Sequence, residues 1–342
     1  MNGKRPTISD IAALAGVSVA TVDRVLSDRA KVSHQSTVKV LGALRALGMA
    51  GRLPPGARDA FRFDVILALE DETFFERYQR AFLHRGASHG VQVRISRAGG
   101  DERQLPRLLT ALLGQSGRCH GLVVIGENTP AMQSQIASLA LAGIPTVLLL
   151  SPMEAAGSDY IGIDNYAAGR TAGYLLGAFL GGRGTALLIT HTLDFPSHQQ
   201  RVRGFTDLCG ERYPAIAIVG PLECHDTAHQ CHAAVAAQMA AGIGFDGIYH
   251  TGAGSEGVAS ALAGRTVRAW VAHELTPVNA ALLKKGAISV VLDQDVELQV
   301  EAAIEELLYR NGIIEQAADD FVVPFHVVTP ENAGGTARSG RR

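Results

Sequence analysis

Two patterns of hydrophobic and polar positions divide the chain near residue 60. Before it, apolar residues recur three or four positions apart, as at Ile11, Leu14 and Ala15 and again at Val22, Val25 and Leu26. From residue 62 onward, short continuous apolar runs alternate with longer amphipathic stretches. The first spacing predicts short helices that each bury one stripe, and the second predicts buried strands alternating with helices.

The second part of the chain contains many such units. The expected strands are 65–69, 91–95, 121–125, 146–150, 186–190, 215–219, 247–250, 268–272 and 289–292. The expected helices are 75–89, 102–113, 131–142, 168–180, 199–209, 228–241, 257–263, 277–285 and 297–309. Parallel sheets covered by helices on both faces have this pattern, and one sheet rarely holds so many strands. We therefore expect a small all-α headpiece followed by an α/β body of two doubly wound parallel-sheet lobes.

The first two predicted helices are joined by a tight turn, which indicates a helix-turn-helix. Gly16 stands where a left-handed residue ends the first helix, Ser18 is placed to cap the second, and Ser9 can cap the first. After Ser18, the residues off the apolar stripe are Val19, Ala20, Asp23 and Arg24. A helix with a small N-terminal face and an arginine one turn later can enter the major groove of DNA. Spacing alone leaves a helical hairpin of some other fold as the alternative.

This region also resembles a known headpiece. The matching runs are Thr7–Ala12, Ala15–Val22, Arg24–Leu26 and Val32–Ser33, continued by Thr37, Val40, Leu44 and Leu47–Gly48. They resemble the headpiece of the LacI–GalR family of bacterial transcription regulators over nearly all of the first 48 residues. The resemblance implies that Val19, Ala20 and Arg24 face bases and that Thr7, Thr21 and Ser33 lie near phosphates; Ser18, which begins the same helix, joins this DNA-binding set. Asp23 departs from the serine usual in the family and turns an acidic group toward the DNA.

The segment after the headpiece departs further from the family pattern. Family members usually have Tyr-x-Pro-Asn-x-x-Ala-Arg here, which forms a hinge helix on DNA. In this chain Gly51 and Arg52 replace the Pro and Asn, and Pro54-Pro55-Gly56 opposes a helix. Leu53 is the candidate for the side chain that enters the minor groove.

Composition adds a charge asymmetry. Through Arg58 the chain has nine Lys and Arg against three Asp and Glu, and the remainder has 22 against 30. A basic head on an acidic body suits DNA binding by the head. The four cysteines lack framework spacing, no hydrophobic core follows the N-terminal charges, and the apolar runs are too short to span a bilayer. We expect a cytoplasmic protein with reduced thiols and no membrane partner.

The body resembles the periplasmic-binding-protein fold, which forms the effector domain of the same family. The resemblance implies crossings between the lobes near 161–164, near 292–295 and just before Phe321, and a final strand like 321–324 with 329–332. The expected domains are a headpiece at 1–48, a hinge or linker at 49–61, a two-lobed effector-binding and dimerisation domain at 62–332 and a disordered tail at 333–342.

Candidate ligand residues follow the expected strands, because α/β folds bind ligands at the carboxyl ends of strands. In the first lobe they are Glu70, Asp71, Phe74, Phe75, Glu127, Asn128 and Ser151. In the second lobe they are His191, Asp194, Arg201, Gly252–Ser255, His273, Glu274, Asp293 and Gln294. Polar groups with a few aromatic rings suit a polyhydroxyl ligand, and for each residue a solvated loop position or a hinge hydrogen bond is the alternative. The resemblance implies a sugar contact for Arg201 and ligand positions for Gln294 and for Glu274, where the family has Asp.

Two further motifs have competing interpretations. Gly252–Gly257 is a GxGxxG between a strand and a helix, which is typical of dinucleotide sites, but its late position favours a tight turn that lines the cleft. Cys224–His232 contains Cys and His at close spacing, with His229 and His232 on one helix face and Cys231 on another. No second Cys/His pair accompanies it, which favours surface histidines over a metal site. We therefore expect no metal, no cofactor and no enzymatic activity.

Together these patterns favour a sequence-specific DNA-binding transcriptional regulator, with repressor as the first choice. One recognition helix reads only a few base pairs, so a homodimer on near-palindromic operator DNA is expected. A small sugar or sugar derivative between the lobes would control operator affinity, with a nucleoside or purine as the alternative effector. The alternative functions are a sugar-binding transport receptor, which has no use for residues 7–48, and an NAD-dependent dehydrogenase that uses the glycine turn.

Overall fold

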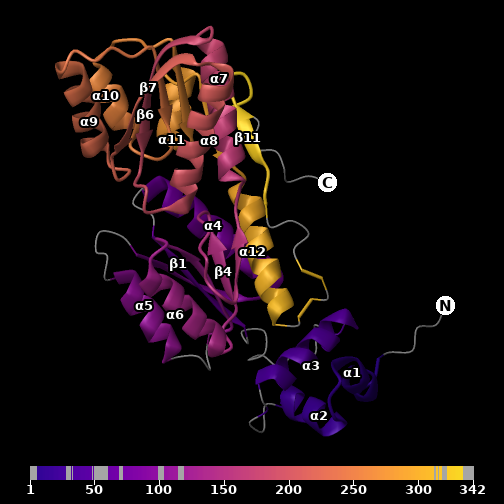
Figure 1. Ribbon diagram of the computed structural model, residues 1–342. Coiled ribbons are helices and arrows are strands. Elements are labelled where there is room, and N and C mark those ends of the chain that lie inside the picture. Colours follow the sequence, from indigo (N-terminus) through magenta and orange to yellow (C-terminus); the bar gives the residue numbers. More distant parts are fainter. Residues whose placement is uncertain are drawn as a thin grey trace.

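The computed structural model shows a three-helix headpiece and two α/β lobes (Figure 1). It describes residues 6–27, 32, 34–47, 49, 61–68, 72–98, 104–114, 119–311, 313–314, 316–317 and 322–333. Within these residues, no helix is both long and apolar enough to cross a membrane.

The headpiece consists of α1 (Ile8–Ala15), α2 (Val19–Ser27) and α3 (His34–Ala46). Gly16 ends α1 with φ 60°, and the Ser18 hydroxyl accepts a hydrogen bond from the Thr21 N–H at 3.1 Å, so the turn forms as predicted. The expected cap of α1 is wrong, because Ser9 lies inside the helix. Thr7 caps it instead, in a capping box in which Asp10 accepts from the Thr7 N–H.

The N-terminal lobe is built on a parallel sheet with strand order β2-β1-β3-β4-β5. Its strands are β1 (Arg62–Leu67), β2 (Gln92–Arg97), β3 (Gly121–Ile125), β4 (Thr146–Leu149) and β5 (Ser158–Ile161). Its helices are α4 (Glu72–His89), α5 (Gln104–Leu113), α6 (Pro130–Leu141) and α12 (Val296–Arg310). Apolar residues of α4 and α12 pack on one face of the sheet, and those of α5 and α6 pack on the other. Every residue of β3 is buried, as expected for a strand covered on both sides.

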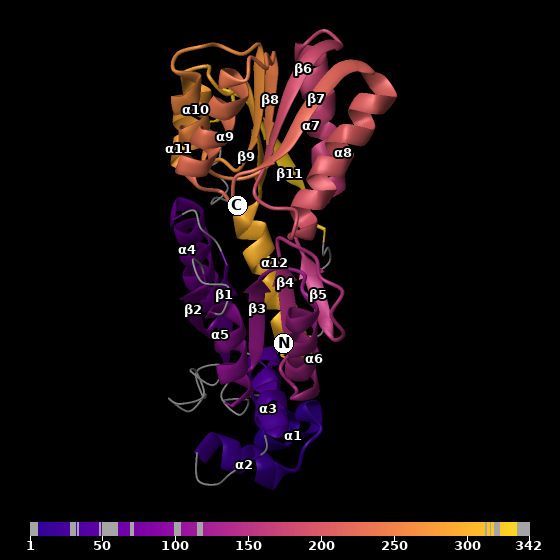
Figure 2. The same cartoon turned by 60° about the vertical axis from the view of Figure 1, so that its left-hand side comes forward.

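The C-terminal lobe has strand order β11-β10-β9-β8-β6-β7. Its strands are β6 (Arg183–Thr190), β7 (Ala215–Glu223), β8 (Gly247–His250), β9 (Ala269–His273), β10 (Val290–Gln294) and β11 (Phe325–Val328). Its helices are α7 (Asn165–Phe179), α8 (Pro196–Arg212), α9 (Ala228–Ala240), α10 (Ser255–Leu262) and α11 (Pro277–Lys284). Figure 2 shows α7 and α8 on one side of this sheet and α9, α10 and α11 on the other. The two doubly wound lobes are therefore confirmed.

Two strands differ from the prediction. The sequence pattern missed β5, because its residues Ser-Asp-Tyr-Ile form a half-buried edge strand without an apolar run. The final strand, β11, lies between the two segments that resembled it and pairs antiparallel with β10. Phe321 lies outside the described residues, while Val322 bridges to Gly162 and the Val323 N–H donates to the Gly162 carbonyl.

The chain passes between the lobes close to the predicted positions. It leaves the N-terminal sheet at Ile161 and begins α7 at Asn165, and it leaves β10 at Gln294 and begins α12 at Val296. The Gly162–Val322 bridge places the C-terminal return beside the first crossing. Three adjacent connections of this kind allow two rigid lobes to move as bodies about a hinge.

Candidate functional site

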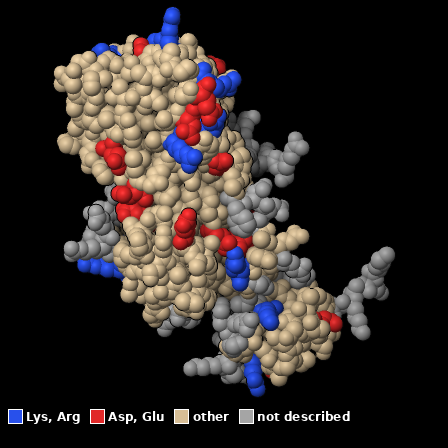
Figure 3. Space-filling view, in the orientation of Figure 1, with Lys and Arg blue, Asp and Glu red and all other residues tan. Residues whose placement is uncertain are grey.

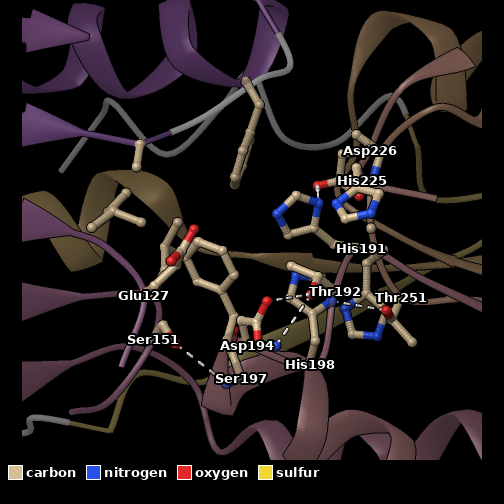
Figure 4. A pocket seen from close by; sticks show the side chains of 18 of the residues that line it. Glu127, Ser151, His191, Thr192, Asp194, Ser197, His198, His225, Asp226 and Thr251 are labelled. Carbon is tan, nitrogen blue, oxygen red and sulfur yellow. Dashed lines mark hydrogen bonds and ion pairs between the residues drawn. The ribbon is translucent and has the colours of Figure 1, made fainter. Parts of the chain in front are cut away.

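A cavity of about 720 Å³ lies between the lobes at the carboxyl ends of their strands. Figure 4 shows Glu127 and Ser151 of the N-terminal lobe on one side and His191, Asp194 and His225 of the C-terminal lobe on the other. The volume is in the range of a small-molecule site. Side chains from both lobes therefore surround the same space.

Arg201 lies in the first turns of α8 and is 4% exposed. Its Nε donates to Asn165 Oδ1 at 2.8 Å, and a terminal nitrogen donates to the Thr251 carbonyl at 2.7 Å. The other terminal nitrogen lies 3.8 Å from Glu274 Oε1. Helices α7 and α8 pack closely at Gly169, because a Cβ at this position would lie only 2.1 Å from the Arg201 carbonyl oxygen. This close approach sets the position of the guanidinium at the cavity wall.

Glu274 follows β9 and Gln294 ends the neighbouring strand β10, and both side chains line the cavity. Gln294 donates to Glu274 Oε1, Gln299 donates to Gln294, and the Tyr78 hydroxyl donates to Gln299. Burial raises the pKa of Glu274 to about 7, against the effects of Arg201 and the Gln294 hydrogen bond. A buried polar chain therefore runs from the cavity to α12 and α4.

Histidines dominate the opposite part of the C-terminal wall. His198 Nδ1 lies 2.9 Å from the Thr251 hydroxyl, and the His191 ring packs against Phe195, His198 and His225 (Figure 4). Burial lowers the pKa of His198 and of His273 well below the ordinary value, and that of His250 to about 4. These three rings are consequently neutral at pH 7, and each can both donate and accept a hydrogen bond.

Polar contacts between described residues join the lobes directly beside the site. The Ser197 N–H donates to the Ser151 hydroxyl at 3.3 Å across the cavity (Figure 4). Arg77 of α4 binds both carboxylate oxygens of Asp293 on β10, at 2.8 and 3.1 Å. The lobes are therefore held together on both sides of the site.

The structure brings together most of the described effector candidates. Those that line the cavity are Phe74, Glu127, Arg201, Glu274 and Gln294. Phe75 does not line it: neighbouring helical residues point about 100° apart, and this ring packs in the core under the Arg97 guanidinium at 5.2 Å. Asp71 and Glu70 lie outside the described residues.

Of the other candidate ligand residues, some line the cavity and some do not. Those in the cavity wall are Ser151, His191, Asp194, His273 and Gly252–Ser255. Asn128 instead accepts a hydrogen bond from Gln133, and Asp293 is occupied by Arg77. The glycine turn between β8 and α10, with Gly254 at φ 90°, presents its backbone to the cavity.

Sequence reasoning missed several lining residues. His198 precedes Arg201 by three positions on α8, so helical spacing alone could have placed both on one face. His225 and Asp226 belong to a segment interpreted as a surface cluster, yet both line the cavity, and Asp226 lies 3.7 Å from His191. His229 and His232 are exposed, while Cys231 is buried on another face, as the spacing predicts. Among the described residues, the one group spaced for a metal lies elsewhere, at His89, Glu301 and Glu305.

The headpiece presents one face of α2 to solvent. Val22 and Val25 are buried, whereas the exposed residues are Ser18, Val19, Ala20, Asp23 and Arg24. Thr21 is half-buried, and the Thr7 hydroxyl donates to Asp10 within the capping box. Ser33 and Leu53 lie outside the described residues. On the face drawn in Figure 3, acidic side chains lie mainly over the two lobes.

Comparison with known proteins agrees with this architecture. A model of bacterial regulatory proteins of the lacI family matches residues 7–50, and a model of the periplasmic binding protein domain matches residues 63–310. The chain therefore carries the N-terminal domain of the lacI family of bacterial regulatory proteins. It joins the family's DNA-binding headpiece to a periplasmic-binding-protein-like domain, and the family is one of regulators rather than enzymes.

Individual relatives are more distant. The HTH-type transcriptional regulator GntR of Escherichia coli K12 is 28% identical over 174 residues, which is 50% of this chain and 51% of that protein. The chain thus spans about half the length of the curated relatives that it matches. Among solved structures, a glucose-galactose binding protein, GanP of Geobacillus stearothermophilus, has a TM-score of 0.72 at 20% identity over 80% of this chain and 98% of its own. A solute binding protein of Burkholderia graminis in complex with D-arabinose has a TM-score of 0.75 at 20% identity over 81% and 98%.

Proposed function

We propose that this lacI-family chain is a homodimeric DNA-binding transcriptional regulator whose operator affinity is controlled by a small effector bound between the lobes. One observation carries the proposal: the same chain joins an exposed recognition-type helix to a polar cavity between two hinged lobes. We assign it first as a repressor. Its place of action is then the cytoplasm, where the operator DNA is.

The exposed face of α2 supports the DNA-binding role. Val19 and Ala20 give a smooth N-terminal end that can approach base edges, and Arg24 follows one turn later with its guanidinium free to reach a guanine. Ser18 and Thr21 at the start of the helix, with Thr7, are assigned to the phosphates. The same assignment extends to Ser33, and Leu53 is assigned to the minor groove.

The chemistry of the cavity supports a polyhydroxylated effector. Phe74 offers a ring to C–H faces, while Arg201, Glu274, Gln294 and Glu127 offer hydrogen bonds to hydroxyl groups. Structural neighbours that bind glucose, galactose or arabinose share the fold and make sugar chemistry the first choice. Asp71, which follows the first strand, belongs to the same proposed set.

Closure of the lobes supplies the regulation in this proposal. The Ser151–Ser197 and Arg77–Asp293 contacts change with the angle between the lobes, because each joins one lobe to the other. An effector that favours one angle alters the spacing of two headpieces in a dimer. Effector and operator affinities are then coupled reciprocally.

A gel shift against the chain's own upstream DNA, with and without candidate sugars, tests the proposal. Arg24→Ala is expected to cost about 1–3 kcal/mol at one base pair of the operator. Arg203→Ala, at an exposed arginine of α8 in the other part of the molecule, is the matched control and should leave operator binding unchanged. No retarded band with any effector would contradict the proposal, and equal losses on specific and random DNA would contradict base reading by Arg24.

A sugar-binding transport receptor is the second candidate, favoured by the fold of the structural neighbours. It would bind sugar without binding DNA. The same gel shift separates the two functions, since only the regulator forms a band whose intensity depends on sugar.

A further inference from the structure

The charged side chains around the cavity are mostly acidic. Among the described lining residues there are five carboxylates, at Glu127, Asp194, Asp226, Glu256 and Glu274, against one guanidinium, at Arg201. Two donor groups of that guanidinium are already directed at protein oxygens. A cleft lined by one sign of charge focuses its field on whatever binds there. The cavity therefore favours a cation over an anion.

A second observation locates where positive charge is needed. Glu274 and Asn279 are 7% and 3% exposed and both line the cavity, yet Glu274 Oε2 and Asn279 Oδ1 have no hydrogen-bond partner. The orientation of the Asn279 amide is fixed, because its Nδ2 donates to the carbonyl oxygens of His273 and Glu274, each at 2.8 Å. Asn279 Oδ1 is therefore an acceptor, and so is Glu274 Oε2 when the side chain is ionised; buried acceptors are normally paired with donors.

The backbone holds Glu274 in place before any ligand arrives. Its φ is 64°, a left-handed conformation that is uncommon for a residue other than glycine. The Glu274 N–H donates to the Leu292 carbonyl at 3.0 Å, and the Leu275 N–H donates to Asp293 Oδ1 at 2.8 Å. Backbone strain that the surrounding structure fixes in this way is concentrated at ligand clamps and switches.

We propose that the effector carries an ammonium group, which lies between Glu274 and Asn279. This inference rests on the proposed function, because it assigns the chemistry of the ligand in the same cavity. An ammonium has three N–H donors, so it can satisfy both orphaned acceptors and compensate the carboxylate. A hydroxyl has one donor and satisfies only one of them. A carboxylate or phosphate would add acceptors to a wall that already has an excess of negative charge.

Three open-chain polyols that differ only at C1 test the proposal. They are 1-amino-1-deoxy-D-sorbitol, D-sorbitol and D-gluconate, with an ammonium, a hydroxyl and a carboxylate group at that carbon. Titration calorimetry of the full chain is expected to give a Kd at least about tenfold lower for the amine than for sorbitol, since a charge-assisted hydrogen bond is roughly twice as strong as a neutral one. Gluconate is expected to bind most weakly.

Glu274→Gln keeps the size of the side chain, removes its charge and should bring the amine and sorbitol affinities to within about twofold of each other. The control is Glu211→Gln on α8, whose carboxylate is 54% exposed and pairs with Arg170; the preference for the amine should persist. The proposal is overturned if sorbitol or gluconate binds as tightly as the amine, if the amine does not bind, or if Glu274→Gln retains the preference. A gel shift with the same preparations tests the regulator function separately, because the operator complex can form whatever the order of the polyols.

Discussion

The two walls of the cavity are built differently. The N-terminal wall is mostly apolar, with Ala68, Phe74, Leu105, Ile125 and Met132 beside the carboxylate of Glu127. The C-terminal wall is polar, and hydrogen bonds to the protein hold its main side chains, as at Arg201 and His198. An effector bound as proposed would be oriented mainly by hydrogen bonds on one side and covered by apolar surface on the other. In the proposed function, the C-terminal lobe would then recognise the effector, and the N-terminal lobe would close over it.

The largest expected effect is on the polar wall. Arg201→Ala leaves Asn165 Oδ1 and the Thr251 carbonyl without their donors and leaves Glu274 without its nearest cation. We expect a loss of about 3–5 kcal/mol in the free energy of unfolding, measured by urea titration. Arg203→Ala is the control: this side chain is 77% exposed, and a change below about 0.5 kcal/mol is expected. If Arg201→Ala and Arg203→Ala lowered the free energy of unfolding equally, the hydrogen bonds of the polar wall would contribute no more to stability than a surface side chain does.

A second test uses pH and the buried carboxyl group of the polar wall. The pKa of Glu274 is about 7 in the folded chain against an ordinary value of 4.5, so between these values the folded state holds a proton that the unfolded state has lost. Its contribution to stability is therefore full below pH 4.5 and is lost as the pH rises through 7, by up to about 3 kcal/mol.

Glu274→Gln should remove this dependence. The difference in unfolding free energy between the wild type and Glu274→Gln should therefore change between pH 5 and pH 8 in the variant's favour. A constant difference would contradict the raised pKa. The buried histidines act in the opposite direction: the pKa of His198 and of His273 is lowered by burial, so their contribution is lost as the pH falls below 6.5. Both proteins contain these histidines, so the difference in unfolding free energy between them at each pH reports the Glu274 carboxyl group alone.

The smallest expected effect is on the apolar wall. Phe74 and Phe75 both pack in the core of the N-terminal lobe, but only Phe74, whose ring centroid is 5.2 Å from that of Tyr78, also lines the cavity. Phe74→Ala should weaken effector binding by about 1–2 kcal/mol, because a ring face is lost from the ligand. Phe75→Ala should leave binding unchanged and lower the free energy of unfolding by about 3 kcal/mol. Calorimetry and urea titration on the pair measure both quantities, and a loss of binding in Phe75→Ala alone would reverse the assignment.

Prediction from the sequence was most accurate where the structure is local. The turn between α1 and α2 depends on Gly16 and Ser18, which act on their immediate neighbours, and it formed as predicted. The buried strands β3 and β8 have continuous apolar runs and were predicted with their exact bounds. The edge strand β5 has no such run, because only part of it is buried, and it was missed.

The sequence by itself determined the class of the protein: the headpiece, the two doubly wound lobes, and the segments after β6 and β9 that carry Arg201 and Glu274. These follow from periodicity, and from short motifs and the family resemblance that they carry, all of which depend on runs of a few residues. Only the tertiary structure decided which candidates meet. It left Phe74, but not Phe75, lining the cavity, and it brought Asp226 beside His191 and the Tyr78 hydroxyl of α4 beside Gln299 of α12. Such contacts depend on the packing of helices and strands far apart in the chain, which local patterns do not specify.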